Sequence, residues 1–111
     1  MRKFHHVGIP TTKPISRERY LPRLKMYVGG FEESPYGIEW MRFEPDAPQP
    51  ELVKTVPHVA FEVDDLRSEL EGQNVIVEPT SSSEGLIVAF IEYDGAPIEL
   101  MQIDRTVYEG K

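Results

Sequence analysis

Two histidines and two glutamates recur at matching places in the two halves of this 111-residue chain. The segment "HHVGIPT" aligns with "PHVAFEV", which places His6 on His58. In the same way "GIEWMRFE" aligns with "PIELMQID", which places Glu39 on Glu99. Imidazole nitrogens and carboxylate oxygens bind divalent metal ions, and carboxylates also serve as general acids and bases. The recurrence therefore indicates one shared chemical site rather than four unrelated residues.

The period of a β-strand predicts that the four side chains share one face of a sheet. Side chains at positions i and i+2 of a strand point the same way. In each segment the immediate neighbours are mostly apolar, as expected of the face packed under a helix, whereas His6, Glu39, His58 and Glu99 occupy the other face. If the halves form curved sheets that pack side by side, the four residues converge in one hollow.

Two imidazoles and two carboxylates predict a divalent metal site with His6, Glu39, His58 and Glu99 as ligands. The two carboxylates balance the charge of the ion, and an octahedral ion keeps two positions for water or substrate. The mixed ligands suit Zn, Ni, Co, Mn or Fe better than Ca, which prefers oxygen alone. Without an ion, the two carboxylates would repel each other and one would tend to hold a proton.

Simpler interpretations exist for each residue taken singly. A histidine on a strand often has no special task, and Glu39 is also compatible with a solvent-facing place on a half-exposed strand. His5 has the opposite parity to His6, which predicts a packing or exposed residue rather than a ligand. Glu62 shares the face of His58 and is interpreted as a solvated carboxylate, with an acid–base role as the alternative.

Alternating apolar residues predict most of the strands that must position these residues. The predicted strands cover residues 4–10, 25–34 with a break at the Gly29-Gly30 pair, 36–44, 55–63, 74–79, 86–93 and 98–103. A helix is predicted from Ile15 through Leu21, and a second, capped by Asp64 or Asp65, ends near Gly72. The proline-rich stretch 45–55 and the segment "TSSSEG" are predicted to be loops.

Composition limits the classes of protein to which this chain can belong. The net charge is −7 and no Lys/Arg cluster is present, which argues against nucleic acid and anionic membranes as partners. There are no cysteines, so disulfides, thiolate metal sites and a cysteine nucleophile are excluded. The amino end lacks the apolar run of a signal peptide, and no stretch is long enough to span a bilayer. We therefore expect a cytoplasmic protein.

The order of elements predicts an α+β fold built from two tandem βαβββ modules that form one curved mixed sheet. Module one covers about residues 1–50 and is shortened by eight residues in its middle, and module two covers about 55–105. Together they make a single domain, residues 1–111. Open sheets leave edges that a second subunit often covers, so a homodimer is expected.

The segments "FHHVGIP", "VPHVAFEVDDL" and "EYDGAPIELMQ" resemble the vicinal oxygen chelate superfamily, which includes glyoxalase I, epimerases, bleomycin-resistance proteins and extradiol dioxygenases. The resemblance covers nearly all of the second half and both ends of the first. It implies a glyoxalase-like fold with metal ligands on the first and last strands of each module, which correspond to His6, Glu39, His58 and Glu99. The short first module and the lack of a basic cluster for a glutathione adduct argue against glyoxalase I activity itself.

Three functions are consistent with these observations. The first is a metal-dependent lyase or isomerase that acts on a small carbonyl substrate, whose enediolate the ion would chelate, with Glu99 or Glu39 as the base. The second is a binding or resistance protein that holds a small molecule without turnover. The third is an iron-dependent ring-cleaving dioxygenase that uses His6, His58 and Glu99.

Overall fold

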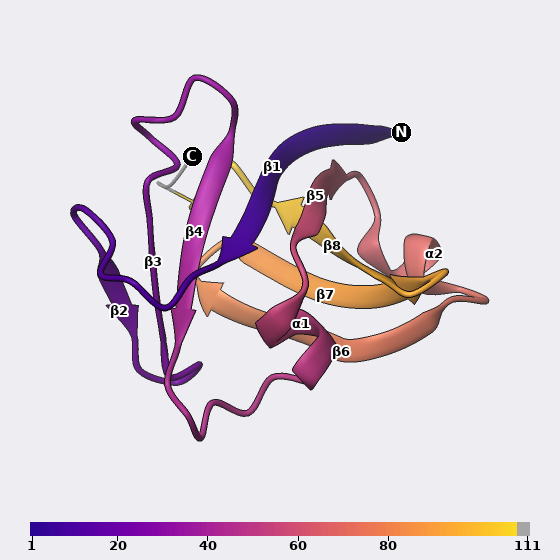
Figure 1. Cartoon of the computed structure of the whole chain (residues 1–111). Coiled ribbons are helices and arrows are strands. Elements are labelled where there is room, and N and C mark those ends of the chain that lie inside the picture. Colours follow the sequence, from indigo (N-terminus) through magenta and orange to yellow (C-terminus); the bar gives the residue numbers. More distant parts are fainter. Residues whose placement is uncertain (109–111) are drawn as a thin grey trace.

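Eight strands form one curled, mixed sheet, a half-barrel, in the computed structural model, which describes residues 1–108 apart from the side chain of Ser82 (Figure 1). The strands are β1 (Arg2–Pro10), β2 (Arg19–Leu21), β3 (Met26–Gly29), β4 (Ile38–Phe43), β5 (His58–Val63), β6 (Asn74–Ser83), β7 (Leu86–Tyr93) and β8 (Ala96–Ile103). Two short helices are described, α1 (Glu51–Thr55) and α2 (Leu66–Leu70). This confirms an α+β fold with a curved mixed sheet. The last three residues of the predicted domain, 109–111, lie outside the described part.

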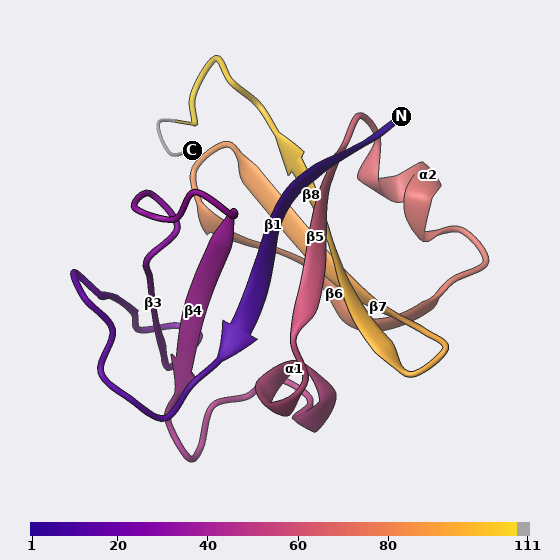
Figure 2. The ribbon, with the colours of Figure 1, turned by 45° about the horizontal axis from the view of Figure 1, so that its top comes forward.

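The strand order β2-β3-β4-β1-β5-β8-β7-β6 brings distant parts of the chain together at the centre of the sheet. β1 and β5 pair antiparallel, and each has a parallel partner on its other side, β4 for β1 and β8 for β5. Figure 2 shows β4, β1 and β5 running side by side. The two strands that carry histidines are therefore central, and the two that carry the matched glutamates flank them.

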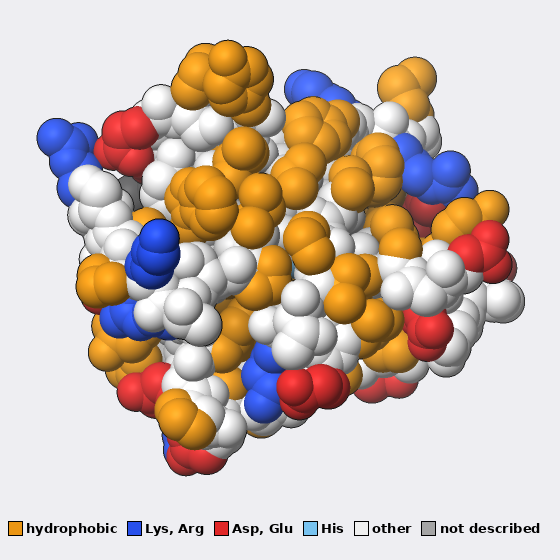
Figure 3. All heavy atoms as spheres, viewed as in Figure 1, with side chains coloured by type: hydrophobic (Ala, Val, Ile, Leu, Met, Phe, Trp, Pro, Cys, Tyr) orange, Lys and Arg blue, Asp and Glu red, His pale blue; other side chains and the backbone are white. Residues whose placement is uncertain are grey.

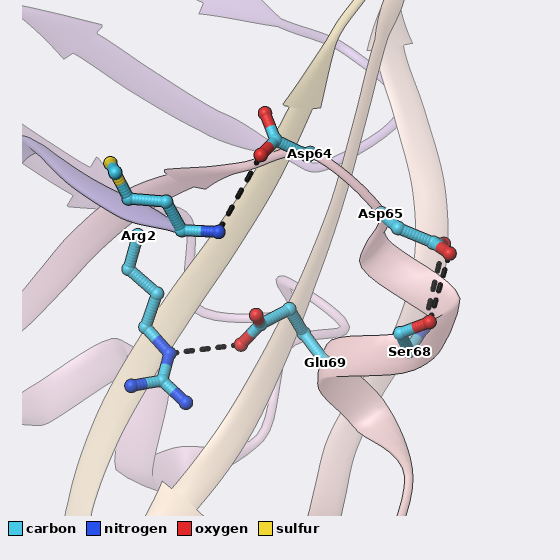
Figure 4. A network of polar contacts seen from close by, with 6 residues as sticks. Arg2, Asp64, Asp65, Ser68 and Glu69 are labelled. Atoms are coloured by element: carbon cyan, nitrogen blue, oxygen red, sulfur yellow. Dashed lines mark hydrogen bonds and ion pairs between the residues drawn. The ribbon is translucent and has the colours of Figure 1, made fainter.

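The helix predicted after β5 is present and capped as its sequence indicates. Asp65 is the N-cap of α2, and its carboxylate accepts hydrogen bonds from the backbone N–H and the hydroxyl of Ser68 (Figure 4). A side-chain cap of this type stabilises a helix by about 1 kcal/mol. The Arg2 guanidinium of β1 also donates to Glu69 of α2 over 2.9 Å, which fastens the helix to the sheet (Figure 4).

The prediction of a helix from Ile15 through Leu21 is wrong. Within residues 1–50, all of which the structure describes, no helix forms, and this segment contains a turn followed by β2. Arg17 has a positive φ of 56°, and Arg19 pairs with Val28 of β3. Pro14 and Pro22 bracket too few residues for a stable helix, so pairing with β3 decides the conformation.

Two predicted loops contain regular structure. The stretch 45–55 includes α1, which begins directly after Pro50 and buries Val53. Proline is tolerated at a helix start because the first N–H groups have no partner inside the helix. β6 continues to Ser83 through most of "TSSSEG", because Thr80 pairs with Val88 and Ser83 with Leu86 of β7. In the part of the chain that the structure covers, no helix has the length and apolar composition needed to cross a membrane.

Apolar side chains pack on both faces of the sheet. On the outer face, α2 and the second half of the sheet enclose a core of Val63, Leu66, Ala89, Ile91 and Leu100. On the inner face, two smaller clusters consist of Met26, Val28 and Met41 and of Ala60, Leu86, Val88 and Met101. Residues of the inner clusters line the same hollow as the histidines and glutamates, so apolar side chains frame the site.

Candidate metal centre

Strand register places the four predicted residues around two small ones. Gly8 pairs with His58 on one side and Glu39 on the other. Ala60 likewise pairs with His6 on one side and Glu99 on the other. A Cβ on Gly8 would come within 2.2 Å of the Cε1 atom of His58, so only glycine leaves room for this ring. The small residue two positions after each matched histidine is thus what lets the side chains of neighbouring strands converge.

Three of the four predicted ligands come together. The Glu99 Oε1 atom lies 2.9 Å from His58 Nε2 and 3.3 Å from His6 Nε2. The ligand atoms of these three residues all lie within 4.8 Å of one another. The residues are buried, with exposed fractions of 4% for His6, 2% for His58 and 9% for Glu99. This group could hold a metal ion.

The hydrogen bonding of the two rings supports that assignment. The Nε2 atoms of His6 and His58 are buried and have no hydrogen-bond partner among residues 1–108. The Glu99 carboxylate lies at ion-pair distance from both atoms. Two imidazoles with one carboxylate are donors that divalent transition metals accept. The residues present therefore fit a divalent cation.

Glu39 lies beside this group rather than in it. Its Oε1 atom is 3.4 Å from His6 Nε2, and its side chain is 26% exposed, against 12% for that of Glu99. Glu39 also lines the open hollow over the centre. The predicted role of Glu39 as a fourth ligand thus remains a prediction, and its location also suits a group that contacts a substrate.

The electrostatic environment shifts the pKa values of the two carboxylates in opposite directions. Burial raises the pKa of Glu99, but the imidazoles of His58 and His6 outweigh it and lower the pKa to about 2. Burial raises the pKa of Glu39, His6 partly offsets this, and the charge of Glu99 raises it further. For His6, burial lowers the pKa, but the carboxylates of Glu99 and Glu39 outweigh burial and leave it raised. Glu99 is therefore held as the anion, while Glu39 holds a proton more readily.

Replacing Glu39 with Gln is expected to stabilise the metal-free protein at neutral pH. Because the folded pKa of Glu39 lies above its unfolded value, the free energy of unfolding falls as the pH rises from 4.5 through the folded pKa. Glutamine cannot ionise and so removes this loss of stability. The gain in the free energy of unfolding should therefore disappear at about pH 4, where Glu39 is mostly protonated in both states. Urea denaturation with a chelator present, at both pH values, measures the difference. Glu78→Gln, at an exposed position of β6, is the control, and a gain confined to low pH would contradict the expectation.

His5 is not one of the three grouped residues, in agreement with the prediction, but it lies on the same face as His6. The register of β1 against β5 shifts between Phe4 and His6, so His5 is the extra residue of a β-bulge. A bulge interrupts the alternation of side chains, and His5 lines the same hollow as His6. The doubled histidine in "FHHVGIP" was the available signal, but a bulge cannot be read from strand parity.

Glu62 does not join the centre. It forms a two-pronged ion pair with Arg105, whose Nη2 lies 2.9 Å from Glu62 Oε1. This pair lowers the pKa of Glu62. Glu62 was predicted to be a solvated carboxylate, but its side chain is only 16% exposed and pairs with Arg105.

The centre lines an open hollow of about 790 Å³ formed by the curled sheet. Much of its wall is apolar and comes from both halves of the sheet, including Met26 and Val28 of β3, Leu86 and Val88 of β7, and Met101 of β8. Ligand sites are commonly hollows of this size with apolar walls and a few polar groups at one end. The hollow is large enough for a small organic molecule.

Comparisons with known proteins agree with the fold and say nothing of the chemistry. No protein-family model and no curated protein matches the chain. The chain is similar to the crystal structure of a hypothetical protein from Bacillus halodurans, with a TM-score of 0.73 and 18% sequence identity. The match covers 99% of this chain and 98% of that chain. At this identity the likeness shows the fold alone. Fold and site together define a small α+β half-barrel protein with a candidate metal centre.

Proposed function

We propose that this protein is a metal-dependent lyase or isomerase of the vicinal oxygen chelate type that acts on a small carbonyl substrate. One observation carries the proposal: the buried Nε2 atoms of His6 and His58 converge with the Glu99 carboxylate beside an open hollow. Two imidazoles and a carboxylate buried at one point are a set of ligands that divalent transition metals accept.

The strand order supports the further proposal that the sheet consists of two tandem modules. In the first half, β1 pairs with β4, followed outward by β3 and β2. In the second half, β5 pairs with β8, followed outward by β7 and β6. The same connection therefore occurs twice, with α2 present only in the second. In this arrangement "GIEWMRFE" and "PIELMQID" each form the strand that pairs in parallel with a strand that carries a histidine.

The chemistry follows from the different states of the two carboxylates. A divalent ion held by His6, His58 and Glu99 would act as a Lewis acid toward the oxygens of the substrate. Glu99 stays ionised at any physiological pH and fits the role of ligand. Glu39 has a raised pKa and faces the hollow, so it fits the role of the base that removes a proton from carbon. The apolar part of the wall would lower the local polarity around that proton transfer.

A second candidate is an iron-dependent ring-cleaving dioxygenase. It is favoured by the composition of the group, because two histidines and one carboxylate on an open site are the typical ligands of non-haem Fe(II) oxygenases. In this alternative Glu39 would be an acid–base residue beside the iron.

Metal analysis of the purified protein tests the proposal directly. The full chain is incubated with Zn, Ni, Co, Mn or Fe(II), freed of excess ion, and assayed for bound metal and for oxygen consumption with catechol. We expect about one ion per chain and no oxygen uptake. Uptake with Fe(II) alone would favour the dioxygenase, and a protein that retains none of the five ions would favour a binding protein without turnover.

The outer face of the sheet supports the proposal of a homodimer. Phe4 and Trp40 are large apolar residues with exposed fractions of 52% and 38%. Figure 3 shows apolar side chains spread over the face that Figure 1 presents. Exposed apolar side chains gathered on one face commonly mark an interface. Sedimentation velocity should show a dimer that Phe4→Glu dissociates and that Tyr93→Glu, at an exposed place on β7, leaves intact; a monomeric wild type would overturn the proposal.

A further inference from the structure

We propose that His5 is a positioning residue of the metal centre, which holds the His6 ring so that its Nε2 atom faces His58 and Glu99. This inference rests on the proposed function, since it takes those residues to bind a metal ion. Its starting point is the contact between the two adjacent histidines, whose Nδ1 atoms lie 2.8 Å apart. At this distance one nitrogen carries a hydrogen and the other accepts it.

The direction of this hydrogen bond follows from metal binding. An imidazole that binds an ion through Nε2 uses the lone pair there, so the neutral ring carries its proton on Nδ1. His6 then donates from Nδ1, and His5 must accept at Nδ1 with its own proton on Nε2. Hydrogen bonds to the non-ligating nitrogen of a metal-bound histidine fix the ring orientation and strengthen the ligand.

His5 is itself held in place by two features of the fold. The bulge in β1 turns its side chain to the inner face. Its ring then stacks on Phe31, with 5.2 Å between ring centroids and 10° between planes. Phe31 also meets the His6 ring edge-on at 5.8 Å, so one aromatic residue contacts both histidines. Phe31 follows Gly30, whose φ of +89° and close approach to Trp40 favour glycine.

His58, the second proposed histidine ligand, has no such hydrogen bond at its Nδ1 atom within residues 1–108. The Nδ1 atom of His58 is buried and lacks a hydrogen-bond partner in the described part of the chain. Its ring is instead fixed by packing, edge-on to Phe90 with centroids 5.0 Å apart. The contact between His5 and His6 is therefore a specific feature of one ligand, and its loss should act through the affinity for metal.

Two substitutions separate the hydrogen bond from the packing of the ring. His5→Phe keeps an aromatic ring against Phe31 and removes the acceptor. His5→Asn places an amide oxygen near the position of Nδ1 and can still accept. Zinc affinity of the full chain, measured by competition with a chromophoric chelator, should fall about 10- to 100-fold in His5→Phe. His5→Asn should recover most of this loss.

Nitrogen-15 NMR of the zinc-loaded wild type supplies an independent readout of the tautomers. We expect the proton of His6 on Nδ1 and that of His5 on Nε2, and a proton on Nδ1 of His5 would overturn the proposal even if a variant failed to fold. Equal zinc affinity in His5→Phe and wild type, or equal losses in both variants, would also overturn it. If the wild type binds no zinc or other divalent ion, the proposed function fails as well; if only the effect of His5 is missing, the metal centre stands.

Discussion

A divalent ion that fits the centre is expected to raise the melting temperature of the wild type by on the order of 10 °C at about 100 times its dissociation constant. Binding to the folded state alone stabilises that state by mass action, and the unfolded chain does not hold His6, His58 and Glu99 together. Glu99→Ala should abolish the shift, because it removes the only anionic ligand of the group. Thermal denaturation followed by circular dichroism, with Zn and Ni titrated separately, measures the effect.

The matched control is Glu78→Ala, at an exposed position on β6. It changes the net charge of the chain by the same amount but lies outside the group of ligands, so it should keep the full metal-induced shift. Equal shifts in Glu99→Ala and wild type would show that the ion binds elsewhere. In that case the assignment of the centre would be abandoned, although the fold would be unaffected.

Glu39→Gln is expected to keep metal binding and to lose proton transfer. Glu39 is outside the group of three ligands, lines the hollow and has a raised pKa, which are properties of a general base rather than of an essential ligand. Removing a general base typically costs about 10²- to 10⁴-fold in rate. Hydroxyacetone is a suitable probe because it carries adjacent oxygens and a removable C–H. Proton NMR in D₂O, with the metal-loaded protein, follows the loss of its C–H signal.

Glu92→Gln, on β7 and hydrogen-bonded to Asn74, serves as the control for this variant. Exchange that proceeds at the wild-type rate in Glu39→Gln would remove Glu39 as the base. Loss of the metal together with the exchange would instead identify Glu39 as a ligand, as the sequence predicted. The two results are distinguished by measuring bound metal on the same samples.

The local pattern of the sequence was enough to predict most of the framework. Alternating apolar residues located β1, β4, β5, β7 and β8, because a half-buried strand needs one apolar face whatever lies beside it. The cap of α2 was equally readable, since it involves only Asp65 and a neighbour three residues later. The repeated segments also indicated which side chains share a face. All of these features depend on residues close together in the chain.

Features that depend on contacts between distant segments required the tertiary structure. Pairing with β3, and not helix propensity, decided the conformation of residues 19–21. The bulge that turns His5 toward His6 arises from the register of β1 against β5, which no single segment encodes. Likewise, the sequence could place Glu39 and Glu99 on one face but could not tell that, of these two, Glu99 alone joins the two histidines in the candidate metal centre. That distinction comes from distances of a few ångströms across four strands, which packing sets.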